Sequence, residues 1–442
     1  MSETDSEPQP APLLVLRDGL PPVVDTEAAL RSACAALAEA SGPIAIDAER
    51  ASGYRYSGRA YLIQLRREGA GTTLVDPTAF ASLAALGEVL SGPEWILHAA
   101  TQDLPCLTEL GLRPTSLFDT ELAGRLLGLP RVGLATLVES LLGRRLRKEH
   151  SAVDWSIRPL PAPWLEYAAL DVEVLLELRA KLGARLEEAG KAGWADEEFR
   201  ALLDFAPTSR PDAWRRTSGV HRLRSRRALA AAKALWEERD AIAADRDITP
   251  TRILPDASIV AAAQSLPRNR AALSATPGFH GRGAQRYAAR WTAAVGAALA
   301  LPESALPPRA QRVEGPPLPR SWAERDPVAA RRLALSREAM AAVAATHEVP
   351  VENLLTPDVA RRVLWSPPAS RDPLVLAEEV AAELGRLGAR PWQVKLTVPV
   401  LVGAILGADA PPEPAATEQP QAGQSGGDQA VTPRETERPT QG

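Results

Sequence analysis

The sequence predicts a mixed α/β domain followed by all-α helical domains. From residue 13 to 205, short apolar runs alternate with longer helical patterns, which is typical of a sheet with flanking helices. After residue 206 the strand signals stop, and Ala, Leu, Arg and Glu recur at helical spacing. A chain of 442 residues with 45% hydrophobic residues is also too long for one ordinary core. We therefore expect several domains.

Four segments of the first region are predicted strands. They combine β-branched or aromatic residues with short length and are bounded by Gly, Pro or charged residues. They cover PIAIDAE (43–49), AYLIQLRR (60–67), TTLVDP (72–77) and WILHAA (95–100), with a helical pattern over 79–90 before the last. Together they predict one mixed sheet.

The C-terminal half is predicted to contain two related helical domains. The segment 226–247 is a long helical pattern, and DITPTRILPDASIV (247–260) resembles EVPVENLLTPDVARRV (348–363). We expect the first domain over 206–303, a Pro-rich linker over 304–321 and the second domain over 322–407. The polar, Pro-rich ends, 1–12 and 408–442, are predicted to be disordered.

Charge and cysteine content exclude several classes of protein. The formal net charge of −4 is not that of a uniformly basic chain, although a local basic face would be enough to bind phosphates. Two distant cysteines argue against a disulfide framework and a thiolate zinc site. No secretory signal or membrane-spanning run is recognisable, so we expect a cytoplasmic protein without a membrane partner.

Two carboxylates lie at the end of the first predicted strand. Asp47 and Glu49 are two residues apart, so both side chains leave the same face of the sheet. They repel each other unless a cation lies between them. Taken alone, such a pair also fits a solvated strand end.

Further polar residues follow at two other places. Asp103 stands where the strand 95–100 gives way to a helix, so it fits either a helix cap or a site at the strand ends. Tyr167 and Asp171 are four residues apart in a strongly helical run and share one helix face. A phenol and a carboxylate presented together suit the orientation of a nucleophilic water.

The order and spacing of these motifs resemble a known family. IAIDAE, HAATQDL and YAALD are similar to the three exonuclease motifs of the DEDD superfamily in its tyrosine-containing branch. The connecting segments YLIQL, LVDP, LFDTELAGRLLG and KEHSAVDWSIRPLP resemble those of the ribonuclease D family. The segment that ends in PGFHGRGAQRYAARW (277–291) resembles an HRDC domain. The resemblance implies a ribonuclease H-like mixed sheet with flanking helices.

The resemblance also implies a 3′→5′ exoribonuclease that uses two divalent ions, Mg²⁺ or Mn²⁺. Asp47 would bridge both ions, Glu49 and Asp171 would complete the site of the attacking water, and Asp103 would hold the second ion through water. Tyr167 would align the attacking water. The implied substrates are RNA 3′ ends, as in transfer RNA precursors or other structured RNA. We expect a monomer.

The first motif departs from the family pattern Asp-Thr-Glu-Phe, because it reads Asp47-Ala48-Glu49-Arg50. Arg50 is either a contact to phosphate or a solvent-facing residue. The departure keeps open a nucleic-acid-binding protein with a weak active site. A second alternative is a DNA 3′→5′ exonuclease acting on single-stranded DNA, because the same kind of metal site serves proofreading domains.

Other residues are candidates for RNA binding or for a structural role. Lys148 and Arg158 precede the third motif and could contact the substrate backbone or simply face solvent. Gly278, Gly281 and Gly283 could bring backbone amides near a phosphate. Asp119 is matched to the family too, but its place at a predicted helix start favours a structural acid.

Overall fold

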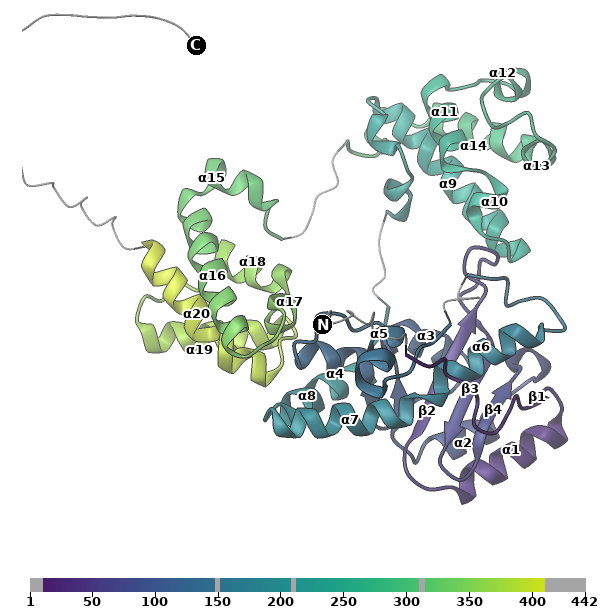
Figure 1. Ribbon diagram of the computed structural model, residues 1–442. Helices are drawn as coiled ribbons and strands as arrows, with labels where there is room; N and C mark the ends of the chain where they lie inside the picture. The colour runs from purple at the N-terminus through teal and green to yellow at the C-terminus, as the bar shows by residue number, and fades with distance from the viewer. Residues whose placement is uncertain (1–10, 148–151, 208–211, 310–314, 410–442) are drawn as a thin grey trace, which may run out of the picture.

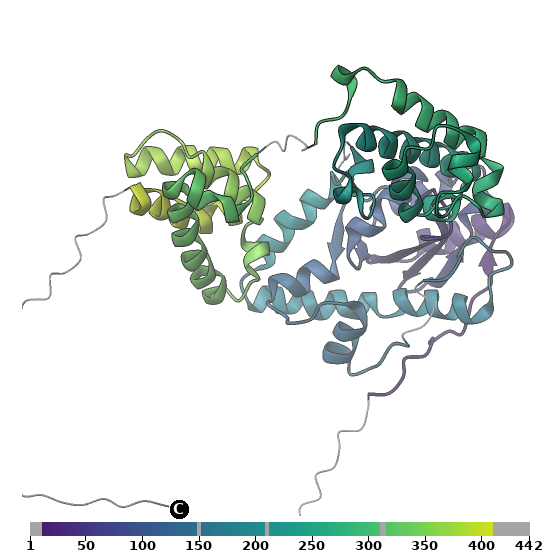
Figure 2. The same cartoon turned by 90° about the horizontal axis from the view of Figure 1, so that it is seen from above.

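The computed structural model describes residues 11–147, 152–207, 212–309 and 315–409. They form one α/β domain and two helical units, which we call the first helical unit (212–309) and the second helical unit (315–409). The two units meet the α/β domain at different places (Figures 1 and 2). The predicted fold class is confirmed.

The α/β domain is built on a six-stranded sheet in the order β1-β4-β3-β2-β5-β6. The central strand β2 pairs antiparallel with β3 and parallel with β5, so the sheet is mixed. Strand β4 is antiparallel to β3. The strands are β1 Val23–Val24, β2 Ile44–Arg50, β3 Ala60–Arg67, β4 Gly71–Val75, β5 Trp95–Leu97 and β6 Leu117–Asp119.

Helices cover the sheet and connect its strands. Helix α6 packs on β2, β3 and β4, and α7 packs on β2 and β5. These two helices therefore flank the central strand. The helices of this domain are α1 Glu27–Glu39, α2 Ala84–Leu90, α3 Leu104–Glu109, α4 Thr120–Leu126, α5 Leu134–Leu137, α6 Ala162–Glu173, α7 Leu175–Glu188 and α8 Ala192–Leu203.

The four predicted strands are present, but the sheet also contains β1 and β6, which the sequence did not predict. Strands of two and three residues are too short to show an alternating pattern. The predicted helical run 164–178 is divided at Val174, which ends α6 and precedes α7. The predicted helix over 79–90 begins only at Ala84, after a 3₁₀ turn at Pro77–Ala79.

The first helical unit has its own hydrophobic core. Its long helix α9 (Arg226–Arg246) matches the predicted helix, and α11 and α14 pack against α9. The other helices are α10 Pro250–Ile253, α11 Asp256–Ser265, α12 Arg270–Ser274, α13 Arg282–Arg286 and α14 Ala288–Ala300.

The first helical unit contacts the loop that follows β2. Asp247 caps α9 in the left-handed region, with φ 44°. Its Oδ1 accepts hydrogen bonds from the backbone N–H groups of Tyr56 (3.1 Å) and Ser57 (2.9 Å). The backbone N–H of Thr249 donates to the carbonyl oxygen of Tyr54 at 3.1 Å. This loop directly continues the strand that carries Asp47 and Glu49.

The second helical unit, in contrast, shares one continuous core with the α/β domain. The rings of Trp194 and Trp392 stack with their centroids 4.7 Å apart. The indole N–H of Trp392 donates a hydrogen bond to the buried carboxylate of Glu198 at 3.1 Å. The unit contains α15 Trp322–Arg325, α16 Pro327–Thr346, α17 Val351–Leu354, α18 Pro357–Trp365, α19 Pro373–Arg386 and α20 Pro391–Asp409.

Helix α20 is long and apolar enough to cross a membrane by length and composition alone. It packs against α16, α18 and α19, and residues such as Leu401 and Ile405 are fully buried. The core of the second helical unit accounts for this hydrophobicity.

Candidate active site

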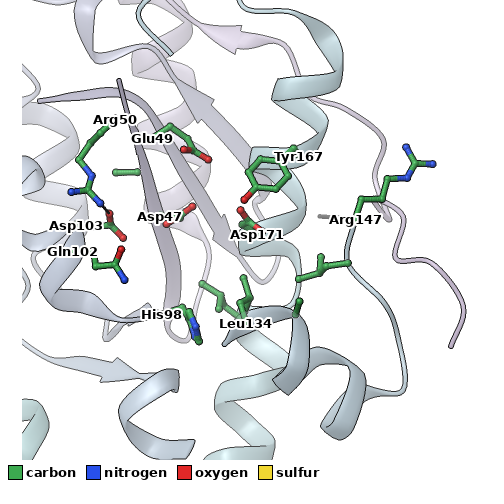
Figure 3. Close-up of a pocket in the computed structure, with 14 residues that line it drawn as sticks. Asp47, Glu49, Arg50, His98, Gln102, Asp103, Leu134, Arg147, Tyr167 and Asp171 are labelled. Atoms are coloured by element: carbon green, nitrogen blue, oxygen red, sulfur yellow. Dashed lines mark ion pairs between the residues drawn. The ribbon is translucent and has the colours of Figure 1, made fainter. Parts of the chain in front are cut away.

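A pocket lies where the end of β2, the start of α3 and helix α6 meet (Figure 3). It brings together all five residues predicted to form the site. Its lining residues are Asp47, Ala48, Glu49, Arg50, His98, Gln102, Asp103, Leu134, Ala135, Leu146, Arg147, Tyr167, Asp171 and Leu175.

Three carboxylates gather in this pocket. Asp47 and Glu49 come from β2, and Asp171 comes from α6, which packs on that strand. One carboxylate oxygen of each lies within 4.8 Å of the others. Carboxylate oxygens are hard ligands of the kind that Mg²⁺ and Mn²⁺ prefer. The donor set therefore fits a divalent cation.

Asp103 contributes a fourth carboxylate from the other side of β2. It is the N-cap residue before α3, yet its side chain makes no capping hydrogen bond to that helix. Instead it is hydrogen-bonded to Asp47. It also forms an ion pair with Arg50, at 3.6 Å between Oδ1 and a guanidinium nitrogen. The sequence left open a helix cap and a site at the strand ends. The side chain of Asp103 does not cap the helix and instead faces the pocket.

Tyr167 stands one helical turn before Asp171 on α6. The two side chains are hydrogen-bonded to each other, and Figure 3 shows the Tyr167 hydroxyl pointing toward Asp171. Burial, and then the negative charges of Asp171 and Glu49, raise the pKa of the phenol. Tyr167 therefore keeps its proton.

The carboxylates of the pocket, of which Asp103 is buried and the others are half-buried, destabilise one another's charge. Burial, followed by the charges of Asp47 and Asp171, raises the pKa of Glu49 to about 10. Burial also raises the pKa values of Asp47, Asp103 and Asp171. Groups of this kind hold protons when no cation is present, and a cation replaces those protons.

This arrangement predicts that the metal-free protein loses stability as pH rises. The pKa of Glu49 is about 10 in the folded protein and 4.5 in the unfolded chain, so the folded protein binds this proton more tightly. The stability that this proton provides is therefore lost progressively as pH rises from 4.5 to about 10. Melting temperatures in EDTA should fall between pH 6 and pH 9, and the fall should be shallower in Glu49→Gln. Equal slopes for the two proteins would contradict the prediction.

Asp119 has a structural position. It is buried and caps α4, and its carboxylate accepts backbone N–H groups from Glu121 and Leu122. It also accepts the N–H groups of Ala99 and Ala100, in the turn before Asp103. The prediction of a structural acid is confirmed by these contacts.

Among the candidate RNA-binding residues, Arg158 has internal partners. Its guanidinium donates to both carboxylate oxygens of Asp76, at 2.5 and 2.7 Å, and to the carbonyl oxygens of Tyr61, Trp155 and Ile157. These contacts tie the segment before α6 to β3 and to the end of β4, and they engage all three guanidinium nitrogens. A contact of Arg158 with the substrate backbone stays a prediction.

The three candidate glycines do not line the pocket, whereas Arg50 does. Gly278 adopts φ +88°, and a Cβ atom there would come within 1.9 Å of Ser258 Oγ, so packing explains the glycine. Gly281 and Gly283 stand at the start of α13 with open space around them. Lys148 lies outside the described residues.

Sequence reasoning did not single out Gln102 and Arg147, which also line the pocket. Gln102 directly precedes Asp103, and Arg147 belongs to the basic run 144–148. His98 lines the pocket as well, with its Nδ1 at 2.9 Å from Thr120 Oγ1, and burial lowers its pKa to about 4. It is therefore a neutral residue at neutral pH.

The fold and the acidic pocket define a nuclease, and the sequence model of the 3′-5′ exonuclease family matches residues 21–187. The HRDC domain model matches residues 228–295, and a model described as the 3′ to 5′ exonuclease C-terminal domain matches residues 315–405. The protein is a 3′→5′ exonuclease, in a family that uses divalent metal ions.

Relatives identify the family more closely. The chain is 33% identical over 306 residues to ribonuclease D of Acidiphilium cryptum, covering 67% of this chain and 77% of the relative. The chain belongs to the ribonuclease D family and is an exoribonuclease.

Two crystal structures resemble most of the chain. A protein from Bifidobacterium adolescentis is 39% identical with a TM-score of 0.82, covering 89% of this chain and 99% of that one. Escherichia coli RNase D is 26% identical with a TM-score of 0.62, covering 83% and 98%.

Proposed function

We propose that this exoribonuclease removes nucleotides from RNA 3′ ends with two divalent cations, Mg²⁺ or Mn²⁺, held by Asp47, Glu49, Asp103 and Asp171. The observation that carries the proposal is the gathering of three carboxylates from β2 and α6 within 4.8 Å, in a pocket that Asp103 also lines. Asp47 lies between the other ligands, because it shares the cluster with Glu49 and Asp171 and a hydrogen bond with Asp103.

Phosphodiester hydrolysis requires an activated water and neutralisation of negative charge on the phosphate. Divalent cations supply both when bound. The four pocket carboxylates named above would determine where that positive charge lies. The protonated Tyr167 hydroxyl, held by Asp171, is placed to orient a water at the cluster.

For the substrate, we propose the 3′ ends of structured RNA, including transfer RNA precursors. Escherichia coli RNase D, which resembles this chain over most of its length, is described as an exoribonuclease involved in structured RNA processing. The net charge of −4 requires that RNA be held by local groups of basic residues. We further propose that the protein acts in the cytoplasm as a monomer.

The proposal is tested by a time course on 3′- and 5′-labelled RNA, each with Mg²⁺, with Mn²⁺ and with EDTA. We expect mononucleotides from the 3′-labelled RNA from the start, progressive shortening of the 5′-labelled RNA, and no reaction in EDTA. A matched DNA oligomer should be shortened more slowly. Reaction in EDTA, or faster shortening of DNA, would contradict the proposal.

Arginines ahead of α9 are expected to contact phosphates. Arg216, Arg222 and Arg224 are exposed at the start of the first helical unit. Replacing all three with Gln should weaken RNA affinity. The association constant for RNA should also fall less steeply with salt, by about 0.7 in the slope of log K against log salt for each lost contact. A control with Arg320, Arg325 and Arg337 replaced, all exposed on the second helical unit, should keep the original slope. Equal slopes for the two triple variants would rule out this role.

A further inference from the structure

We propose that, in the free enzyme, the Arg50 guanidinium pairs with Asp103 at the position where the second cation would bind. Phosphate of the substrate then displaces the guanidinium from Asp103. Arg50 would thereby make binding of the second cation weak in the free enzyme and stronger in the complex with RNA. This inference rests on the proposed function, because it requires that Asp103 bind a cation.

The carboxylates of the pocket are divided into two sets. Asp47, Glu49 and Asp171 lie within 4.8 Å of one another, whereas Asp103 is not part of that cluster. The cationic partner of Asp103 is Arg50, at 3.6 Å, and Figure 3 shows this pair on the side of Asp47 opposite to Tyr167. Among the described residues no ion pair joins a cation to the first set, on which Arg50 acts only through its charge, whereas Asp103 is paired directly with Arg50.

The regular register between β2 and β3 is broken at Arg50, because β3 carries one extra residue there, Tyr61. Consecutive residues of a regular strand point to opposite faces, so Arg50 would point away from Glu49. The register between β2 and β3 shifts between Glu49 and Arg50, where Leu62 is followed by Ala60 as partner. Such an irregularity disrupts the ladder and increases the local twist, so the alternation of faces does not continue past Glu49. Both Glu49 and Arg50 line the same pocket.

The two partners differ in burial. The side chain of Asp103 is only 7% exposed, whereas that of Arg50 is 30% exposed. The carboxylate is therefore fixed within the protein, while the guanidinium lies partly in solvent and can leave without unfolding its surroundings. A guanidinium also binds phosphate oxygens well.

These positions couple the cation to the substrate. A cation that binds Asp103 must displace Arg50, and this displacement reduces the affinity of the cation for Asp103. A phosphate that binds Arg50 frees Asp103, so phosphate and the second cation each increase the affinity of the other.

The test is a Mn²⁺ titration of the full-length protein without RNA, with unbound Mn²⁺ followed by electron paramagnetic resonance. We expect one strong and one weak class of site. In Arg50→Met and Arg50→Gln the weak class should tighten about tenfold, the order of one partly buried ion pair. Adding AMP should tighten the weak class of the original protein but not that of the Arg50 variants.

The matched control is Arg147→Met, which removes a positive charge from the same pocket. Figure 3 shows the Arg147 guanidinium pointing away from the carboxylates. We expect its weak class to be unchanged. An unchanged weak class in both Arg50 variants, or equal tightening in Arg147→Met, would overturn the inference.

Two further variants separate this inference from the proposed function. Asp103→Asn should remove the weak class and Asp171→Asn the strong class. If the original protein shows both classes and each is lost as expected, the proposed site stands whatever the Arg50 variants do. If neither substitution changes Mn²⁺ binding, the proposed site and the inference both fail.

Discussion

Asp171→Asn is expected to abolish 3′ trimming and, at the same time, to raise the melting temperature of the metal-free protein. Activity falls because one of three clustered carboxylates no longer holds a cation. Losing several kcal/mol of charge stabilisation corresponds to a fall in rate of about 10³-fold or more. Stability rises because Asp171 is half-buried, and this desolvation, together with the charge of Asp47, raises the pKa of Asp171 and disfavours its charged form.

Three measurements check this expectation together. The rate on labelled RNA should fall, the melting temperature in EDTA should rise at pH 8, and addition of Mg²⁺ should no longer raise it. Asp204→Asn, an exposed Asp outside the pocket, should change none of the three. Undiminished trimming by Asp171→Asn would remove Asp171 from the site.

Asp119→Ala is expected to lower the free energy of unfolding by about 3 kcal/mol and to slow trimming as well. The substitution removes a helix cap, which costs about 1 kcal/mol, and leaves buried N–H groups of Ala99 and Ala100 without an acceptor, which costs about 1–3 kcal/mol more. That turn leads directly into Asp103, so losing its support shifts a carboxylate of the site.

Chemical denaturation and the trimming rate measure these two effects. Asp326→Ala provides a matched control, because Asp326 caps α16 through the N–H of Ala329 and lies in the second helical unit. It should cost about 1 kcal/mol and leave the trimming rate unchanged. If Asp119→Ala is no more destabilising than Asp326→Ala, the turn does not depend on Asp119.

Much of the site was predictable because its residues lie on regular elements. Strand periodicity placed Asp47 and Glu49 on one face of β2, and helical spacing placed Tyr167 with Asp171 on α6. The position of Asp103 between a strand and a helix did not decide between a cap and a site. That choice depended on the Asp47 carboxylate beside it, which is a tertiary contact.

The remaining differences arise from features without a local sequence signal. The direction of Arg50 depends on a break in the register with β3, and the partners of Arg158 depend on Asp76, which is 82 residues away. Strands β1 and β6 form only because the edges of a sheet are already present to pair with them. None of these contacts can be inferred from periodicity.

The continuous core that joins the α/β domain to the second helical unit has a consequence for biosynthesis. Leu170 of α6 and Ile405 of α20 belong to the same core, although the whole first helical unit lies between them in the sequence. A ribosome makes a chain from its N-terminus at about 5–20 residues per second. The core around the nuclease domain is therefore complete only after Ile405 has been added, many seconds after Asp171, and the intervening first helical unit can fold earlier on its own core.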